Sequence, residues 1–340
     1  ITPVSPTAPS YLAKKLNKIG VPFVVGPLNG GVPWPREFNA ERHAEKEYLS
    51  YLRGAYRMLP WRRATLNHAD AIIAGSYHTA SEVPKKHRNK VIWLPENAID
   101  PAQFSAPPER ADAVPGAGPL RACFIGRMVP YKGPDMLIEA AMPLLQEGIM
   151  SLDMIGDGPL LPELQAQVAR GDVAHAVRFH GWVEHENVAE IAGQNTLLAF
   201  PSIREFGGGV VLEAMAMGLA PLIVDYAGPA ELVQDDTGYK LPLGTREEIV
   251  AGLRGALRRL AAHPAEVMAT GCRARAVVLE HFTWAAKAAK IAKIYDWVLD
   301  KELPRPDFSL VPPDAAHPDA ARPEAGQQDA PQPNKNHAAS

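Results

Sequence analysis

This chain of 340 residues is poor in cysteine, nearly neutral and without long apolar runs. Its two cysteines, Cys123 and Cys272, lie far apart and show no metal-ligand spacing, as expected in a reducing compartment. The longest apolar run, Val210 to Val224, is interrupted by Glu213 and is shorter than the roughly 18 residues of a membrane span. The net charge of −3 supplies no general basic field. We therefore expect no disulfide scaffold, no membrane-spanning helix and no nucleic-acid partner.

Two phosphate-binding motifs are absent as well. A dinucleotide fingerprint needs Gly-x-Gly-x-x-Gly, but the pairs that start at positions 116, 156 and 207 are followed at the last position by Arg121, Leu161 and Leu212. Lys132 lacks the following Ser or Thr with which a P-loop holds magnesium. The sequence thus argues against hydride transfer and against a P-loop nucleotide site.

Metal ligation is not expected either. No Asp-x-Asp sequence occurs, so a diphosphate held by a metal in that way is not predicted. His175, His180 and His185 are close in sequence, but they straddle a strand and its loops instead of one helical face. Charge on a bound phosphate would have to be neutralised by cationic side chains and the backbone.

Strand and helix signals alternate along the chain. Hydrophobic residues make up 46% of it, enough for two ordinary cores. A helical stretch runs from about Asn39 to Asn67 and is interrupted near Pro60. Apolar strand candidates occupy 21–25, 69–74, 91–94, 121–126, 151–155, 177–179, 197–200 and 221–224. This pattern predicts an α/β fold with parallel sheets, which bind ligands outside the carboxyl ends of the strands.

Unusual residues follow several of these strands. Gly126-Arg127 and Lys132-Gly133 precede a helix opened by Pro134, and two fixed cations beside a helix N-terminus favour a diphosphate. Gly156-Asp157-Gly158 ends the next strand, and Trp182 follows the third. These loops are candidates for the floor under a base and ribose. Alone, the first of them is more typical of a simple turn, and Trp182 of a packing residue.

The segment from Glu205 to Glu213 sets two carboxylates across a glycine-rich strand-to-helix turn. We expect Glu213 to open a short helix that ends at Gly218, with Phe206, Gly207 and Gly208 at its N-terminus. Free backbone N–H groups there bind anions, and ionised carboxylates accept hydrogen bonds from the hydroxyls of a diol. The alternative is a helix cap at Glu213 and a solvated loop at Glu205.

Taken in order, these motifs resemble retaining glycosyltransferases of family four, which adopt the GT-B fold. The resemblance covers roughly Pro22 to Trp297 and also includes Gly228-Pro-Ala-Glu231. It implies two Rossmann-like domains with parallel sheets and a UDP- or GDP-linked sugar in the cleft between them. No cofactor is implied beyond this co-substrate. The donor sugar would pass to a glycan, lipid-linked or small-molecule acceptor without a metal.

The resemblance also assigns roles to residues. Arg127 and Lys132 would bind the donor diphosphate and act as electrostatic catalysts, while the departing diphosphate takes the acceptor proton on the same face. Glu205 would contact the donor sugar, and Glu213 the ribose. Further donor-binding residues would be Gly126, Gly156, Asp157, Gly158, Phe206, Gly207 and Gly208. The acceptor-side loop would contain Asn29, Gly30 and Gly31.

The first domain of the family normally begins with a strand and a glycine-rich loop, and neither is found ahead of Ile1-Thr-Pro-Val. We therefore expect an incomplete first domain, without a signal peptide, and weak or absent activity from this chain. The expected division is 1–100 for the partial acceptor-side domain, 101–119 for a linker, 120–283 for the nucleotide-sugar domain, 284–302 for a terminal helix that crosses back, and 303–340 for a disordered tail.

Other interpretations remain open at this level. A sugar-nucleotide epimerase or phosphorylase, or a non-catalytic nucleotide-sugar-binding module, would use the same fold. Residues 53–63 interleave cations with aromatic and aliphatic groups, which suits peripheral contact with an anionic membrane from the cytoplasm, but also suits a solvated helix face. The sequence does not select the base, the sugar or the acceptor.

Overall fold

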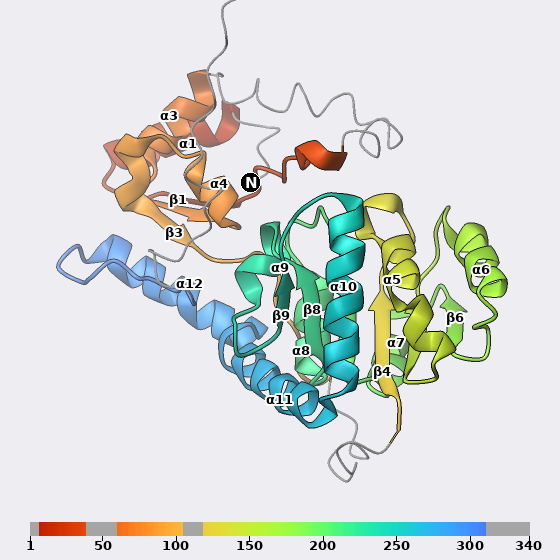
Figure 1. Cartoon of the computed structure of the whole chain (residues 1–340). Helices are drawn as coiled ribbons and strands as arrows, with labels where there is room; N and C mark the ends of the chain where they lie inside the picture. The colour runs from red at the N-terminus through yellow and green to blue at the C-terminus, as the bar shows by residue number, and fades with distance from the viewer. Residues whose placement is uncertain (1–6, 39–59, 105–117, 311–340) are drawn as a thin grey trace, which may run out of the picture.

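The computed structural model describes residues 7–38, 60–104 and 118–310, which form two parallel sheets covered by helices (Figure 1). The smaller sheet has the order β1-β2-β3. Its strands are β1 (Val24–Leu28), β2 (Ala71–Ala74) and β3 (Val91–Trp93). Helices α1 (Thr7–Lys18), α3 (Pro60–His68) and α4 (Tyr77–Ser81) accompany it, with short 3-10 turns η1 (Arg36–Phe38) and η4 (Lys85–Lys90).

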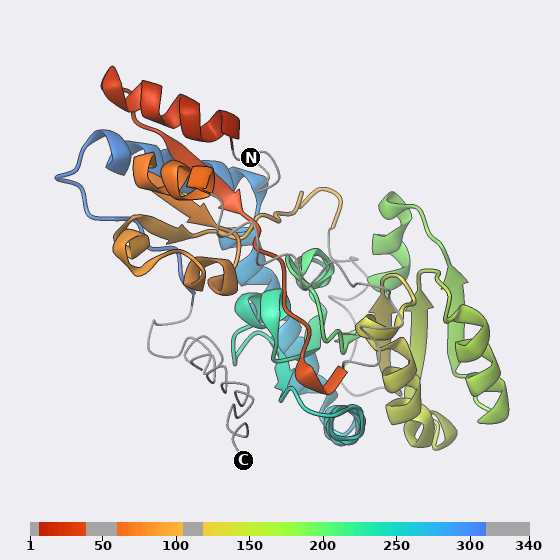
Figure 2. The same ribbon diagram turned by 90° about the horizontal axis from the view of Figure 1, so that it is seen from above.

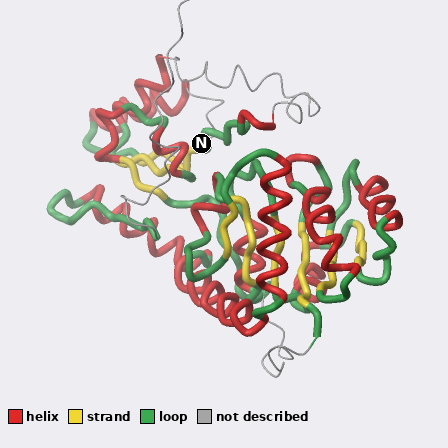
Figure 3. The backbone as a smooth tube through the Cα atoms, viewed as in Figure 1, coloured by secondary structure: helices red, strands yellow, loops and turns green. Residues whose placement is uncertain are grey.

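The larger sheet has six strands in the order β6-β5-β4-β7-β8-β9, all parallel (Figure 3). They are β4 (Leu120–Ile125), β5 (Met150–Ile155), β6 (Val177–Gly181), β7 (Leu197–Phe200), β8 (Ala220–Val224) and β9 (Tyr239–Leu241). The helices are α5 (Pro134–Gln146), α6 (Leu161–Arg170), α7 (His185–Ala192), α8 (Gly209–Ala216), α9 (Ala227–Leu232), α10 (Arg246–Ala261), α11 (Pro264–His281) and α12 (Trp284–Leu299), with η6 (Pro130–Lys132). The predicted α/β fold with parallel sheets is confirmed.

Burial explains why the strands lie where the apolar runs predict them. All residues of β7 and β8 are buried, as expected for central strands with helices on both faces. Helices α5 and α10 pack side by side on the larger sheet, and α8 packs against α11 (Figure 1). The strand order changes direction between β4 and β7, and such a switch point leaves a crevice at the carboxyl ends of the strands.

The first predicted strand is displaced. The sequence predicts it over 21–25, whereas β1 begins at Val24 and continues through Gly26 and Pro27 to Leu28. Pro22 has no N–H for a ladder, and the N–H of Phe23 donates to the Asp70 carboxylate at 2.8 Å instead of to a neighbouring strand. Pro27 is tolerated because the register of β1 on β2 shifts between Val25 and Leu28.

The helix expected over 39–67 falls largely on 39–59, which lie outside the described residues; its last part is α3, which begins at Pro60. Of the linker and tail, 105–117 and 311–340 likewise lie outside them. The described part of the linker packs on the larger domain, where Phe104 is buried in the core. Just before the linker, the Ile99 N–H donates to the Phe282 carbonyl at 2.9 Å. The first residues of the expected tail return to the smaller sheet, where Arg305 donates to the Val91 carbonyl at 2.9 Å.

Helix α12 joins the two sheets. Ile294, Trp297 and Val298 are buried in one cluster with residues of β2 and β3 such as Ile73 and Ile92. The preceding helix α11 packs on α8 of the larger domain. The consecutive helices α11 and α12 therefore hold the smaller sheet against the larger domain.

Glu231 on α9 links the larger domain to the smaller one through a buried carboxyl group. Its two oxygens accept hydrogen bonds from the Tyr77 backbone N–H and the Trp93 indole N–H, each at 2.8 Å. The rings of Tyr77 and Trp93 stack at 4.9 Å between centroids. Burial raises the pKa of Glu231 to about 7, although these hydrogen bonds and the nearby His78 oppose the rise.

This raised pKa predicts a specific dependence of stability on pH. Between pH 4.5 and about 7 the folded protein keeps the Glu231 proton while the unfolded chain releases it, so folding stability falls as the pH rises through this window. The loss would be on the order of 1 kcal/mol per pH unit and would level off above it. Denaturant unfolding of the wild type and of Glu231→Gln at pH 5 to 8 measures this. Parallel curves for the two proteins would contradict the prediction.

Candidate functional site

The carboxyl ends of the central strands meet through glycine backbones. Gly126 directly follows β4 and Gly156 directly follows β5. Both have positive φ angles, +149° and +133°. A Cβ atom at Gly156 would overlap the Gly126 carbonyl oxygen, so no larger residue fits without moving one strand end. The Met128 N–H then donates to the Asp157 carbonyl at 2.8 Å and fastens the two loops together.

These two loops and the start of α7 enclose a cavity of about 460 Å³. Its lining includes Gly126, Arg127, Gly156, Asp157, Gly158, Trp182, Val183 and Val188. The structure thus brings together the three strand ends that the sequence singled out. The Asp157 carboxylate accepts a hydrogen bond from the Gly158 N–H at 2.6 Å, which stiffens the turn.

Trp182 differs from its predicted packing role. Its side chain is 66% exposed and lines the cavity, because the strand ends at Gly181, whose positive φ of +65° turns the chain outward before the indole. An exposed indole beside Val183 and Val188 presents a flat apolar face to the cavity. This geometry suits stacking with a planar ring.

Lys132 and Glu205, which are 73 positions apart, form an ion pair. The Lys132 Nζ lies 3.1 Å from Glu205 Oε2, and the two side chains are 17% and 24% exposed. Lys132 also lies over the Phe200 ring at 5.3 Å and beside Gly126. Arg127 is exposed on the cavity wall next to them. Two cations and one carboxylate therefore share the mouth of the crevice.

The helix at the glycine-rich turn begins earlier than predicted. The sequence indicates a start at Glu213, but α8 starts at Gly209, with Gly208 in the left-handed conformation as its N-cap. Val210 and Val211 are β-branched and weak helix formers, yet burial of Val211 in the core outweighs that preference. Glu213 consequently stands in the second turn and does not cap the helix.

Glu213 on α8 faces His185 at the start of α7. Its Oε1 is 3.8 Å from His185 Nε2, and its side chain is 21% exposed. Burial raises the pKa of Glu213, while His185 and Lys132 counteract part of that rise. The histidine was not predicted to take part in this site.

The glycine-rich turn at the start of α8 packs against a residue from the connection between the domains. A Cβ atom at Gly207 would overlap the Asn97 amide nitrogen, and one at Gly209 would lie 3.2 Å from it. Asn97 carries no motif that sequence reasoning could use, because it reaches the turn only through the path of the chain after β3. Lys287 of α12 holds this connection by donating to the Asn97 carbonyl at 2.8 Å.

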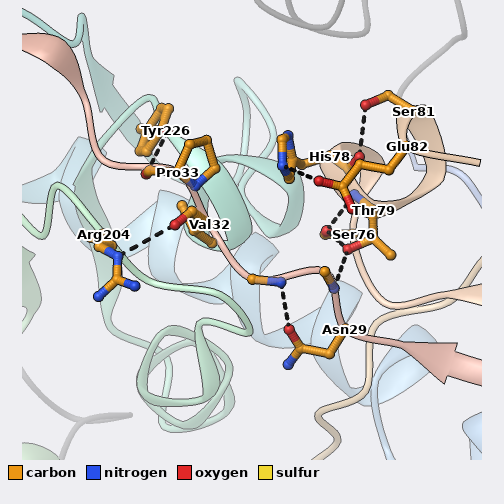
Figure 4. Close-up of polar contacts among 12 residues, drawn as sticks. Asn29, Val32, Pro33, Ser76, His78, Thr79, Ser81, Glu82, Arg204 and Tyr226 are labelled. Carbon is orange, nitrogen blue, oxygen red and sulfur yellow. Dashed lines mark hydrogen bonds and ion pairs between the residues drawn. The ribbon is translucent and has the colours of Figure 1, made fainter. Parts of the chain in front are cut away.

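The predicted acceptor-side loop is anchored to its own domain (Figure 4). The Asn29 amide donates to Glu96 at 3.0 Å, and its oxygen accepts from the Gly31 N–H at 2.9 Å. The Gly30 N–H donates to the Thr79 hydroxyl at 3.0 Å. These bonds tie Asn29, Gly30 and Gly31 to Glu96 and Thr79.

The three histidines have separate surroundings. His180 bonds to the buried Asp153 at 2.8 Å, His185 faces Glu213, and His175 is exposed. Within the described ranges, no group of three or more His, Cys, Asp or Glu side chains is arranged to hold a metal ion. The helices that the structure describes include none that is both long and apolar enough to span a membrane.

Gly228 offers a test of how tightly the glycine-rich turn is packed. Its N–H donates to the Glu205 carbonyl at 3.0 Å, and an added Cβ atom would overlap the Phe206 carbonyl oxygen. We predict that Gly228→Ala destabilises the protein by about 1–3 kcal/mol through this overlap. The free energy of unfolding in denaturant measures the loss.

Gly255→Ala is the matched control, because Gly255 is exposed in the middle of α10 with open space around it. This control should gain up to about 1 kcal/mol from better helix propensity. Equal effects of the two alanines would show that the turn can relax.

Residues 119–259 match the family Glycosyl transferases group 1. The chain is 32% identical over 259 residues to D-inositol 3-phosphate glycosyltransferase of Streptomyces griseus, covering 68% of this chain and 54% of the relative. It is 29% identical to alpha-maltose-1-phosphate synthase of Mycolicibacterium smegmatis, covering 72% of this chain and 67% of the relative. The chain spans about half the length of most of the curated relatives that it matches.

Among solved structures, the fold resembles that of HepE from Anabaena, crystallised with UDP, with a TM-score of 0.63 at 17% identity. The match covers 86% of this chain and 77% of that one. The family match and the structural match agree with the observed fold, which has two parallel sheets and a crevice at the carboxyl ends of the larger one. The chain thus carries a glycosyl transferases group 1 domain and has the GT-B fold.

Proposed function

We propose that the protein is a retaining glycosyltransferase of family four that moves a sugar from a UDP- or GDP-linked donor to a glycan, lipid-linked or small-molecule acceptor without a metal ion. The observation that carries this proposal is the meeting of Lys132, Glu205 and the free N-terminus of α8 beside the cavity that Arg127 and Trp182 line. A neutral nucleoside site would need no such pair of cations.

The donor would lie along this crevice. The base would enter the cavity against Trp182, and the ribose hydroxyls would donate to Glu213. The diphosphate would then meet Arg127, Lys132 and the N–H groups of Gly207 and Gly208, where a helix N-terminus favours negative charge. Glu205 would accept hydrogen bonds from the donor sugar.

The chemistry that suits this arrangement is same-face substitution. The bond from the anomeric carbon to the diphosphate oxygen breaks, the bond to the acceptor oxygen forms on the same face, and the acceptor proton passes to the leaving diphosphate. Charge develops on the diphosphate, where the two cations and the backbone N–H groups stabilise it. The residues therefore need to hold charge, and none of them needs to act as a strong base.

The cations give the direct test of this proposal. We predict that Arg127→Ala and Lys132→Ala each weaken binding of UDP, GDP or ADP at least about tenfold, because each removes a charged hydrogen bond to phosphate. Calorimetry in EDTA measures this, together with sugar transfer from the nucleotide-sugars. Arg121→Ala is the control, since Arg121 is exposed near the start of β4, at the opposite end of the strand from the loop that carries Arg127 and Lys132.

Unchanged diphosphate binding in both variants would refute the assignment. Release of a free epimerised or phosphorolysed product without transfer would identify the epimerase or phosphorylase alternatives. Binding without any reaction would identify a nucleotide-sugar-binding module.

We further propose that the protein works in the cytoplasm and contacts an anionic membrane through the surface of α1 and α3. Of residues 53–63, only 60–63 belong to the described part of the chain; there Trp61 and Arg63 are exposed. The adjoining α1 exposes Tyr11 and Leu12 together with Lys14, Lys15 and Lys18. Aromatic and aliphatic groups among cations suit a lipid headgroup layer.

Vesicle co-sedimentation tests this contact. We predict that the protein sediments with vesicles containing phosphatidylserine and not with neutral vesicles, and that Arg63→Glu reduces the bound fraction severalfold because each basic residue contributes about 1 kcal/mol near such a surface. Arg170→Glu, at an exposed position of α6, is the control with the same change of charge. Equal losses in both variants would indicate a general effect of net charge.

A further inference from the structure

The chain after β1 leaves the smaller sheet and crosses to the larger domain. Figure 2 shows it running from β1 to η1, close to α10. Trp34 and Phe38 are 9% and 2% exposed and belong to the hydrophobic core of the larger sheet, although they follow a strand of the smaller one. Residues 32–38, here called the crossing segment, therefore bring side chains of the first domain into the core of the second.

Two carbonyl groups of the crossing segment are held by side chains of the larger domain (Figure 4). The Tyr226 hydroxyl donates to the Pro33 carbonyl at 3.0 Å, and the Arg204 Nε donates to the Val32 carbonyl at 3.4 Å. These bonds fix the two residues that directly precede Trp34. The position of the Trp34 ring is therefore fixed by hydrogen bonds of the crossing segment as well as by burial.

Trp34 touches the residues that precede the two halves of the Lys132–Glu205 ion pair. Its ring packs edge-on against Tyr131, with centroids 6.1 Å apart and planes at 85°. The Arg204 guanidinium lies over the same ring, 4.9 Å from its centroid. A cation over an indole face and an aromatic edge contact are both directional, so each fixes the position of its partner.

The loops that carry these partners are already joined to each other. The Ile203 N–H donates to the Tyr131 carbonyl at 2.9 Å, and the Ser202 hydroxyl approaches the same oxygen at 3.3 Å. Trp34 thus packs against a single unit of two joined loops, one of which carries Lys132 and the other Glu205. A shift of this unit would move both charged groups relative to the cavity.

We propose that Trp34 is a positioning residue that sets the Lys132–Glu205 pair from the other domain, by holding Tyr131 and Arg204. The expected effect on turnover rests on the proposed function, whereas the expected effect on the position of Lys132 does not. Lys132 and Glu205 have long side chains with several rotatable bonds, and their backbone support decides where the charges stand. A displacement of about 1 Å at a reacting group lowers a rate up to about 100-fold.

The experiment compares Trp34→Leu and Trp34→Phe with Phe38→Leu. Phe38 is buried in the same core, so its variant controls for lost packing in the crossing segment. Chemical acylation of lysines at low temperature, read by mass spectrometry, reports how freely Lys132 leaves its pair. Lys290 of α12, which donates to the His281 carbonyl at 2.9 Å, is the internal reference.

We expect Trp34→Leu to raise the acylation rate of Lys132 relative to Lys290 severalfold, and Trp34→Phe to restore most of the protection because a ring remains for Tyr131 and Arg204. Phe38→Leu should lower the thermal midpoint without this change. In sugar transfer, Trp34→Leu should lower kcat about tenfold with less than about threefold change in the donor KM, the pattern of a misplaced reacting group.

The outcomes separate the two proposals. If the wild type shows neither nucleotide binding nor transfer, the proposed function fails, and the acylation of Lys132 still decides the role of Trp34. Equal Lys132 reactivity in the wild type and Trp34→Leu, or equal change in Phe38→Leu, would overturn the positioning role. If the Trp34→Leu protein is too unstable to label, Trp34→Met takes its place. The same two results would then overturn the positioning role.

Discussion

The site depends on close contact between backbones at the carboxyl ends of parallel strands. At Gly156 there is no room for a Cβ atom because the Gly126 carbonyl occupies that place, and Gly228 meets the carbonyl of Phe206 in the same way. These contacts draw the loops after β4, β5 and β8 and the turn before α8 into one small region. In the proposed function, this close packing is what would let the N–H groups at the start of α8 and the cations of the β4 loop act on one ligand.

Charge is distributed unevenly over this region, and burial controls it. Lys132 and Glu205 form an ion pair, whereas burial raises the pKa of Glu213. A buried carboxyl has already lost much of its water when the protein folds. Accepting hydrogen bonds from hydroxyl groups therefore costs it less desolvation than it would cost an exposed anion beside a phosphate.

Much of the larger domain could be predicted from the sequence because its signals are local. Each buried strand is an apolar run, and parallel strands bring Arg127, Asp157 and Trp182 to one edge without further information. The start of α8 was missed because the β-branched valines before Glu213 disfavour a helix locally, and only tertiary burial shows otherwise. Trp34, Asn97 and Glu231 could not be assigned roles, because each acts on a partner in the other domain.

The contacts between domains suggest why these residues sit where they do. Glu231 links α9 to Tyr77 and Trp93, Lys287 holds the connection at Asn97, and the crossing segment inserts Trp34 beside Tyr131. Asn97 lies against Gly207 of the glycine-rich turn, Leu232 beside Glu231 lies against Gly208, and Tyr131 directly precedes Lys132 in the cationic loop. A change in the angle between the domains would therefore act first on the groups proposed to hold the donor. Under the proposed function, the smaller domain would support the donor site mechanically in addition to providing an acceptor surface.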